Sequence, residues 1–303
     1  MTILVPCSCA HRVSPHPCRR GLARIVCIAV ALLAFAAPLH PQASARAGIV
    51  SVVADSMPMP QLGRVRRIRV YLPPDYATTT RRFPVLYMHD GQQLFDSATN
   101  RAGKWGVDEA LDSLHRAGHG GVIVVAVDND GAHRLNEYAP WHRATPRITA
   151  EGDAYLAFLA HTLKPMIDAR YRTRPEPAST AIMGSSMGAL ISLAAVLRHP
   201  AVFGRAGVFS CACWLVRDSI VALARRAGAL TPRPRLWFVV GGNETPDDEP
   251  VHDHRLVVTA LREAGYRPER DFVAHERADG THEEWFWRRE FPAAVVWLLG
   301  LRR

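Results

Sequence analysis

Hydrophobic and polar residues follow two different periods along this chain, and each period predicts a different element. Residues 48–55 and 64–72 alternate apolar and polar positions, which is typical of antiparallel strands. Apolar residues three and four apart over 152–169 predict an amphipathic helix. Short apolar runs predict further strands at 83–88, 121–127, 181–183, 205–210, 236–240 and 271–275, and helical spacing recurs after residues 106 and 188 and at 216–227, 252–264 and 283–299.

The order of these elements predicts the fold class. Beyond the first two strands, strands and helices alternate, and repeated strand–helix units form a mostly parallel sheet with helices on both faces. A chain of 303 residues that is 48% hydrophobic is long enough for one large domain of this kind. We therefore expect a single α/β domain over residues 46–303.

The N-terminal segment has the pattern of a secretory signal peptide. Arg19, Arg20 and Arg24 precede the apolar run 25–37, and a small-x-small cleavage site follows at 43–45. The apolar run is too short to span a bilayer comfortably, and no cysteine follows it at a position for lipidation. We expect residues 1–45 to be removed, which leaves a periplasmic or secreted protein without a stable membrane anchor.

Net charge and cysteine content narrow the possible partners. The formal net charge of +9 falls to +5 when the four arginines of residues 1–45 are removed. No Lys/Arg-rich run, zinc-finger spacing or heptad repeat is present, so we expect no nucleic-acid partner.

Cys211 and Cys213 are the cysteines of the mature domain. A disulfide across so short a loop should be strained, and nothing completes a zinc site, so we expect two small buried residues.

A Gly-x-Ser-x-Gly motif lies where a strand is expected to run directly into a helix. Gly184 and Gly188 flank Ser186, with the apolar run 181–183 before them and helical spacing after them. This arrangement is the nucleophile elbow of α/β-hydrolases, in which a tight, strained turn exposes the serine hydroxyl at the carboxyl edge of the sheet. Bulk at either glycine would collide with neighbouring backbone. Ser186 is therefore the candidate nucleophile.

A serine hydroxyl needs a base to take its proton, and a carboxylate to orient that base. In this fold the acid and the histidine follow the serine in that order. His282 lies on a loop directly after the last expected strand, whereas the other later histidines lie in or beside helices or within that strand. Glu244 follows a Gly-Gly turn at the end of the strand 236–240, and Asp247 and Asp248 are rival acids.

Two loops at the same edge are expected to contact the substrate. The strand 83–88 ends in a segment containing Gly91 and Gln92, one of which should share the oxyanion hole with the backbone N–H of Met187. We expect Gly91 to allow the substrate to approach closely. The long loop 128–149 is a candidate substrate-binding element, and we assign substrate contacts to its residues Arg134, Tyr138 and Trp141.

Several short motifs are spread along the chain: YLPPDY at 71–76, VLYMHDGQQLFD at 85–96, WGVD at 105–108, EYAP at 137–140, GSSMG at 184–188, GTH at 280–282 and WR at 287–288. Through these motifs, residues from about 60 to 300 resemble the bacterial putative-esterase family of α/β-hydrolases. That family contains siderophore trilactone esterases, feruloyl and acetylxylan esterases, S-formylglutathione hydrolases and mycolyltransferases. By this resemblance Ser186 and His282 take the family's nucleophile and base, and Glu244 sits where the family has its acid.

The expected reaction is transfer of an acyl group from an ester to Ser186 and then to water, which requires no metal or cofactor. Export favours esters met outside the cytoplasm, and carbohydrate-linked acyl esters and siderophore esters are the two leading groups. Two other classes stay open: an acyltransferase, in which an alcohol replaces water, and a non-catalytic binding protein of the same fold. The presence of a serine, an acid and a histidine in the required order argues against the last.

Overall fold

The computed structural model describes residues 47–95, 103–144 and 147–302. The chain separates into two compact units, Met1–Ala43 and Ser44–Arg303, and all described residues belong to the second. The expected signal peptide and its four cysteines lie outside the described residues.

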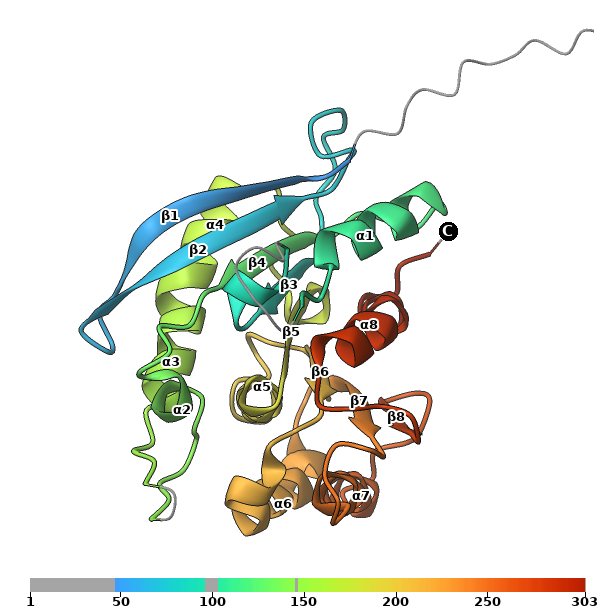
Figure 1. The fold of residues 1–303 in the computed structure, drawn as a ribbon. Helices are drawn as coiled ribbons and strands as arrows, with labels where there is room; N and C mark the ends of the chain where they lie inside the picture. Colours follow the sequence, from blue (N-terminus) through green and yellow to red (C-terminus); the bar gives the residue numbers. More distant parts are fainter. Residues whose placement is uncertain (1–46, 96–102, 145–146, 303) are drawn as a thin grey trace, which may run out of the picture. The chain divides into compact units, whose positions relative to one another are not determined.

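Within the described residues, eight strands form one sheet in the order β1-β2-β4-β3-β5-β6-β7-β8 (Figure 1). The first two strands pair antiparallel with each other, and β2 pairs antiparallel with β4, whereas every later pair is parallel. The predicted α/β class with a mostly parallel sheet is therefore confirmed. The strands are β1 (Ile49–Met59), β2 (Arg64–Leu72), β3 (Val85–Met88), β4 (Ile123–Val127), β5 (Thr180–Ser185), β6 (Arg205–Phe209), β7 (Arg235–Gly241) and β8 (Phe272–Arg277).

Helices cover both faces of the sheet. On one face α1 (Val107–Arg116) packs against α8 (Glu284–Leu299), on the right of the sheet in Figure 1. The helices on the other face are α3 (Gly152–Phe158), α4 (Lys164–Arg170), α5 (Met187–Arg198), α6 (Arg217–Arg225) and α7 (Glu249–Glu263). The helix expected over 152–169 consists of α3 and α4 joined by the π-helical turn η3 (Leu159–Leu163).

Side-chain alternation along the buried strands divides the core into two clusters. On β3, Val85 and Tyr87 join the cluster under α3 to α7, while Leu86 and Met88 join the cluster under α1 and α8. The same division holds along β4, because successive residues of a strand point to opposite faces. A strand buried on both faces must be apolar throughout, which explains the uninterrupted apolar runs in the sequence.

Short elements connect the strands and helices. The loop 128–149 contains the one-turn helix α2 (Arg134–Glu137), and a backbone bridge joins Arg143 to Ile148. The remaining short helices of the described residues are η1 (Gly91–Gln93), η4 (Pro177–Ser179), η5 (Cys213–Val216) and η6 (Arg226–Ala229).

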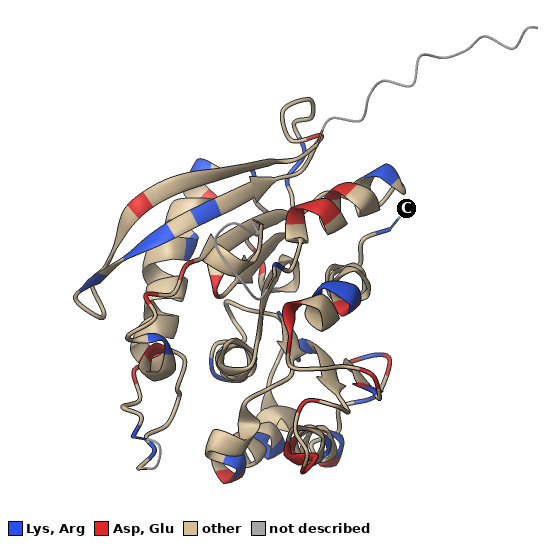
Figure 2. Cartoon of the chain, viewed as in Figure 1, with Lys and Arg blue, Asp and Glu red and all other residues tan. Residues whose placement is uncertain are grey.

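Charged residues are concentrated on the outer elements. Figure 2 shows acidic and basic positions along α1 and α7 and basic positions along β2, whereas α5 is almost free of charged residues. Helix α5 is buried along nearly its whole length, so the helix that follows the serine motif is surrounded by protein. No helix among residues 47–95, 103–144 and 147–302 is long and apolar enough to cross a membrane.

Candidate active site

Ser186 occupies a strained turn between β5 and α5. Its φ of 56° and ψ of −120° lie in a region that side-chain-bearing residues rarely adopt. The turn is tight enough that a Cβ on Gly184 would lie 2.9 Å from the backbone carbonyl carbon of Gly188, as expected from the motif. A Cβ on Gly188 would instead meet the His89 side chain, at 3.3 Å. The Ser186 side chain is half-buried and lines a pocket at the carboxyl edge of the sheet.

His282 and Glu244 meet at the same edge. The imidazole Nδ1 of His282 lies 2.8 Å from Oε2 of Glu244, whose carboxylate is almost fully buried. Backbone hydrogen bonds align the two loops that carry them. Asn243 donates its N–H to the carbonyl of Gly280 at 2.9 Å, and Gly242 donates to the carbonyl of Arg277 at 2.8 Å. The end of β7 and the loop after β8 are thereby held side by side, and this brings the acid to the histidine.

The rival acids lie elsewhere. Asp247 Oδ1 accepts the backbone N–H of Glu249 at 3.3 Å, and Asp248 is the residue preceding α7, with φ of 54°. Together with His252, both line a separate polar depression that does not include Ser186 or His282. Of the three acids considered from the sequence, Glu244 is the one that contacts His282.

Two further residues, which the sequence pattern did not single out as site residues, hold Glu244. The hydroxyl of Ser210 donates to Glu244 Oε1 at 2.5 Å, and the indole Nε1–H of Trp287 donates to Ser210 Oγ at 2.8 Å. The backbone N–H of Gly241 also donates to Oε1, at 2.7 Å. Ser210 directly follows β6, and its place at the carboxyl end of a buried strand is the signal that could have identified it.

The backbone donors expected for an oxyanion hole lie at two element starts. Met187 is the first residue of α5, where backbone N–H groups have no partner within the helix. Gly91 and Gln92 begin η1, after His89 and Asp90 have used their N–H groups on Met183 and Tyr138. A Cβ on Gly91 would lie 2.6 Å from Oδ1 of Asp128. The glycine is thus required for packing against the end of β4, and its role in letting the substrate approach closely stays a prediction.

The pocket at Ser186 is lined mainly by apolar groups. Its volume is about 450 Å³. Ser186, His282 and Met187 line it, as do Ser210 and Glu244. The apolar wall consists of Leu135, Ile148, Ala212, Trp214, Leu215 and Pro250. No three His, Cys, Asp or Glu side chains gather as metal ligands anywhere in the described part of the chain.

Of the three residues assigned to substrate contacts, only Arg134 lines this pocket. Its guanidinium donates to both carboxylate oxygens of Asp90, from Nε at 2.7 Å and from Nη2 at 2.8 Å. Tyr138 is 0% exposed and packs between His89 and Tyr155, so it does not reach the pocket. Trp141 packs on the core under the guanidinium of Arg198, 4.5 Å from the ring centroid. The assignments of Tyr138 and Trp141 to direct substrate contacts are therefore not supported by their positions.

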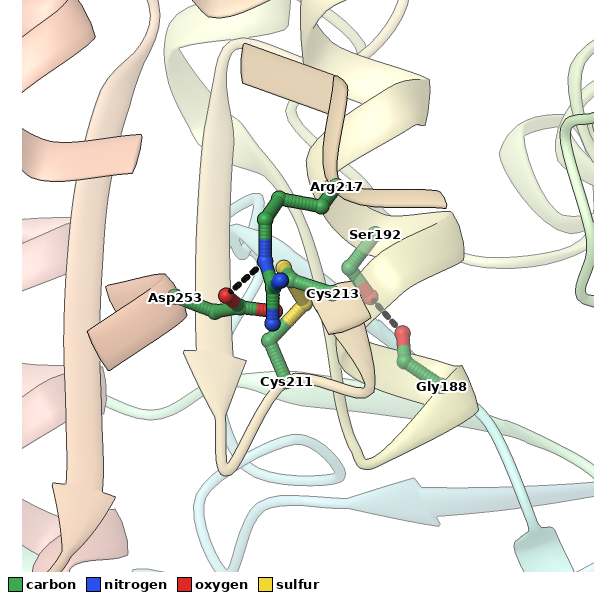
Figure 3. Close-up of a disulfide and its surroundings, with 6 residues drawn as sticks. All are labelled: Gly188, Ser192, Cys211, Cys213, Arg217 and Asp253. Carbon is green, nitrogen blue, oxygen red and sulfur yellow. Dashed lines mark hydrogen bonds and ion pairs between the residues drawn. A yellow bond between two sulfur atoms is a disulfide. The ribbon is translucent and has the colours of Figure 1, made fainter. Parts of the chain in front are cut away.

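Cys211 and Cys213 form a disulfide, which corrects the expectation of two unlinked cysteines (Figure 3). An extended segment would separate their Cα atoms by about 6.6 Å, but the chain bends here and the separation is 5.1 Å, well within the usual range for disulfides. Ser210, with φ of 48°, starts the bend, and Ala212 donates its N–H to the carbonyl of Ser186 at 3.1 Å. Arg217 extends past the disulfide to pair with Asp253 of α7 (Figure 3).

Comparison with known proteins agrees with this geometry. A family model described as "Putative esterase" matches residues 60–298. The uncharacterized protein YbbA of Bacillus subtilis is 28% identical over 250 residues, which cover 78% of this chain and 94% of that protein. An endo-1,4-beta-xylanase/feruloyl esterase of Xylanibacter ruminicola is 26% identical over 232 residues, which cover 75% of this chain and 28% of that protein.

Solved structures share the fold at low sequence identity. A ferulic acid esterase superposes with a TM-score of 0.64 at 18% identity, covering 84% of this chain and 98% of the other. The enterobactin esterase from Shigella flexneri superposes with a TM-score of 0.65 at 19% identity, covering 86% of this chain and 61% of the other. At this level of identity the likeness establishes the α/β-hydrolase fold.

Proposed function

The chain belongs to the putative-esterase family and is a carboxylic ester hydrolase, and on that premise we propose that it is an exported serine esterase with Ser186, His282 and Glu244 as its triad. The observation that carries the proposal is the hydrogen bond between His282 Nδ1 and Glu244 Oε2, made at the pocket that Ser186 lines. With Nδ1–H donated to the carboxylate, the lone pair of Nε2 is available to accept a proton.

In the proposed mechanism His282 Nε2 removes the proton of Ser186 as Oγ attacks the ester carbonyl. The N–H of Met187 and that of Gly91 or Gln92 donate to the oxyanion, whose negative charge they stabilise. His282 then returns the proton to the departing alcohol, which leaves an acyl group on Ser186. Water repeats the cycle: His282 takes its proton, the hydroxyl attacks the acyl group, and Ser186 recovers its proton as the acid leaves.

The pocket supports an uncharged, apolar substrate group. Its wall is largely apolar, and the one arginine that lines it is paired with Asp90. An unpaired cation would attract an anionic siderophore ester, whereas the charge of Arg134 is neutralised by Asp90. We therefore place carbohydrate-linked acyl esters first among the proposed substrates and siderophore esters second.

Export is proposed from the basic, apolar and small-x-small segments of residues 1–45. The Cys211–Cys213 disulfide supports it, since structural disulfides persist mainly in oxidising compartments. N-terminal sequencing of the protein recovered from its producing cell should begin near Arg46. Recovery of a cytoplasmic protein with Met1 intact would contradict export.

Labelling with a fluorophosphonate probe tests the nucleophile. Ser186 should be labelled, and Ser186→Ala should remove both labelling and ester hydrolysis, with a loss in kcat of about 10⁶. Circular dichroism and thermal unfolding serve as controls, because Ser186 is half-buried and its removal leaves no cavity in the core. Labelling at the neighbouring Ser185, or equal labelling of the variant, would rule out Ser186.

A further inference from the structure

We propose that Ser210 and Trp287 are positioning residues that fix the acid and the base of the active site relative to each other. The inference rests on the proposed triad and extends it by two side chains. Neither would touch the substrate carbonyl. Ser210 would act through Glu244, and Trp287 would act through Ser210 and through the imidazole of His282.

The hydrogen bonds around Ser210 have only one possible direction. An indole N–H can donate but cannot accept, so Ser210 Oγ must be the acceptor in its 2.8 Å contact with Trp287. The single hydroxyl proton is then available for Glu244 Oε1, 2.5 Å away, because a carboxylate can only accept. Trp287 thereby orients the Ser210 hydroxyl toward the acid.

These contacts separate the two oxygens of Glu244. Oε1 accepts from Ser210 and from the backbone N–H of Gly241 at 2.7 Å, whereas Oε2 accepts from His282 at 2.8 Å. A carboxylate held at one oxygen by two donors cannot rotate away from the imidazole without breaking both bonds. The direction of the His282 ring is therefore set from the buried side of the site.

The backbone at Ser210 indicates that its hydroxyl is the useful feature of this position. Its φ of 48° favours glycine, yet the residue is a serine that is 1% exposed. Its N–H is bonded to the carbonyl of Val239 at 2.8 Å, which anchors the turn to β7. A glycine would fit this backbone without steric cost but would leave Glu244 and Trp287 without their shared partner.

Trp287 also contacts the base directly. Its ring lies nearly perpendicular to the His282 ring, with centroids 5.3 Å apart, and it also packs on Trp105, with centroids 5.7 Å apart. His282 is on an exposed loop, so a buried ring behind it limits the positions that the imidazole can take. One side chain from α8 thus contacts the histidine and, through Ser210, the carboxylate.

The experiment measures kcat and KM with p-nitrophenyl acetate, and the second-order rate constant for fluorophosphonate labelling of Ser186. Ser210→Ala should lower kcat and the labelling rate by about tenfold, because one hydrogen bond to a charged group is lost, with KM nearly unchanged. Ser210→Gly provides the same test with a residue that suits the backbone, in case the alanine variant does not fold. Trp287→Phe, which retains a ring but no N–H, should cause a smaller loss.

The double variant distinguishes positioning from general damage to the fold. Because the indole N–H acts through Ser210, Trp287→Phe should lower kcat and the labelling rate much less in the Ser210→Ala variant than in the wild type. Trp297→Phe is the matched control. Trp297 lies on the same helix but packs against Trp237 and under the guanidinium of Arg235, and it does not line the Ser186 pocket. Its substitution should leave kcat and labelling unchanged.

Failure of the positioning role and failure of the esterase proposal give different results in these measurements. A wild-type protein that neither hydrolyses the ester nor reacts with the probe would overturn the serine-esterase proposal itself. If the wild type is labelled at Ser186 and both Ser210 variants match its rate, the positioning role is overturned while the esterase proposal stands. The positioning role would likewise be overturned if Trp287→Phe lowered kcat equally in the wild type and in Ser210→Ala, or if Trp297→Phe caused the same loss as Trp287→Phe.

Discussion

Arg134 is bound to Asp90 by two parallel hydrogen bonds, so the one arginine that lines the pocket is already neutralised by a carboxylate. Asp90 adopts a left-handed backbone conformation, with φ of 55°, at the start of the loop that carries Gly91 and Gln92. The amide of Asn129 also donates to Asp90 Oδ1, at 2.5 Å. The ion pair is therefore placed to hold the loop of the proposed oxyanion hole rather than to attract an anionic substrate.

This relationship predicts the effect of removing Arg134. Arg134→Ala should lower kcat/KM by about tenfold on anionic and neutral esters alike, because the loop carrying the oxyanion donors shifts. The loss should not depend on ionic strength. The measurement compares an anionic with an uncharged ester at low and high salt, with Arg134→Lys as the variant that retains the charge. A selective loss on the anionic ester, larger at low salt, would instead establish charge recognition.

Substitution of the acids tests the choice of Glu244. Glu244→Gln should slow turnover by roughly 10³-fold without unfolding the protein, since the glutamine can bond to His282 but cannot stabilise the imidazolium. Asp247→Asn is the matched control and should be silent, because that carboxylate bonds to the N–H of Glu249 outside the pocket. His282→Ala should cost more than Glu244→Gln. A damaging Asp247→Asn beside a silent Glu244→Gln would contradict the assignment.

The strand periods and the serine motif predicted most of the fold and the order of the triad candidates, because both depend on local sequence. A buried parallel strand must be apolar along its length, and a strand-to-helix turn as tight as that at Ser186 needs glycine at position 184. Such constraints can be read from single segments. The predicted elements accordingly lie within a few residues of those in the structure.

The remaining parts of the site depend on contacts between distant segments. Ser210 and Trp287 are 77 positions apart, and their hydrogen bond exists only because β6 ends beside α8. The sequence does not show that Arg134 is paired, because its partner, Asp90, lies 44 residues earlier. The Cys211–Cys213 disulfide depends on a bend at Ser210 with positive φ, which residue type alone does not indicate.

The disulfide gives a prediction for the thiol content. After removal of residues 1–45, Cys211 and Cys213 are the only cysteines in the sequence, so exported protein unfolded in denaturant should show no free thiol with Ellman's reagent. The same domain produced in a reducing cytoplasm should show two thiols per chain. Two thiols in exported protein would contradict the disulfide.

Removing the disulfide should affect the pocket more than the fold. Closing so short a loop constrains the unfolded chain little, so Cys211→Ser with Cys213→Ser should cost only about 1 to 2 kcal/mol of unfolding free energy. Cys211 and Ala212 line the pocket, and Ala212 donates to the carbonyl of Ser186, so KM should rise. Thermal unfolding and steady-state kinetics on the same preparation measure both effects. A large loss of stability, together with an unchanged KM for the molecules that remain folded, would contradict this prediction.

Because His89 and His254 are buried, we expect the protein to lose stability in mild acid. Burial lowers the pKa of His89 to about 4, an effect partly opposed by the charge of Asp90, and burial likewise lowers the pKa of His254 to about 4. In the unfolded chain both pKa values return to about 6.5. Between these limits the unfolded state binds more protons, so unfolding becomes easier as the pH falls from 6.5 to 4.

The loss should reach about 3 kcal/mol for each histidine at pH 4, and it should level off below that pH as the folded state also takes up the protons. His254→Gln isolates one contribution, because His254 packs against Phe238 and does not line the Ser186 pocket. Denaturant unfolding between pH 7.5 and 4 should show a shallower dependence on pH for this variant than for the wild type. Carboxylates titrate over the same pH range in the wild type and in the variant, so the contribution of His254 is the difference between their two curves of unfolding free energy against pH. Parallel curves would mean that His254 takes up its proton equally in the folded and unfolded states, which would contradict the prediction.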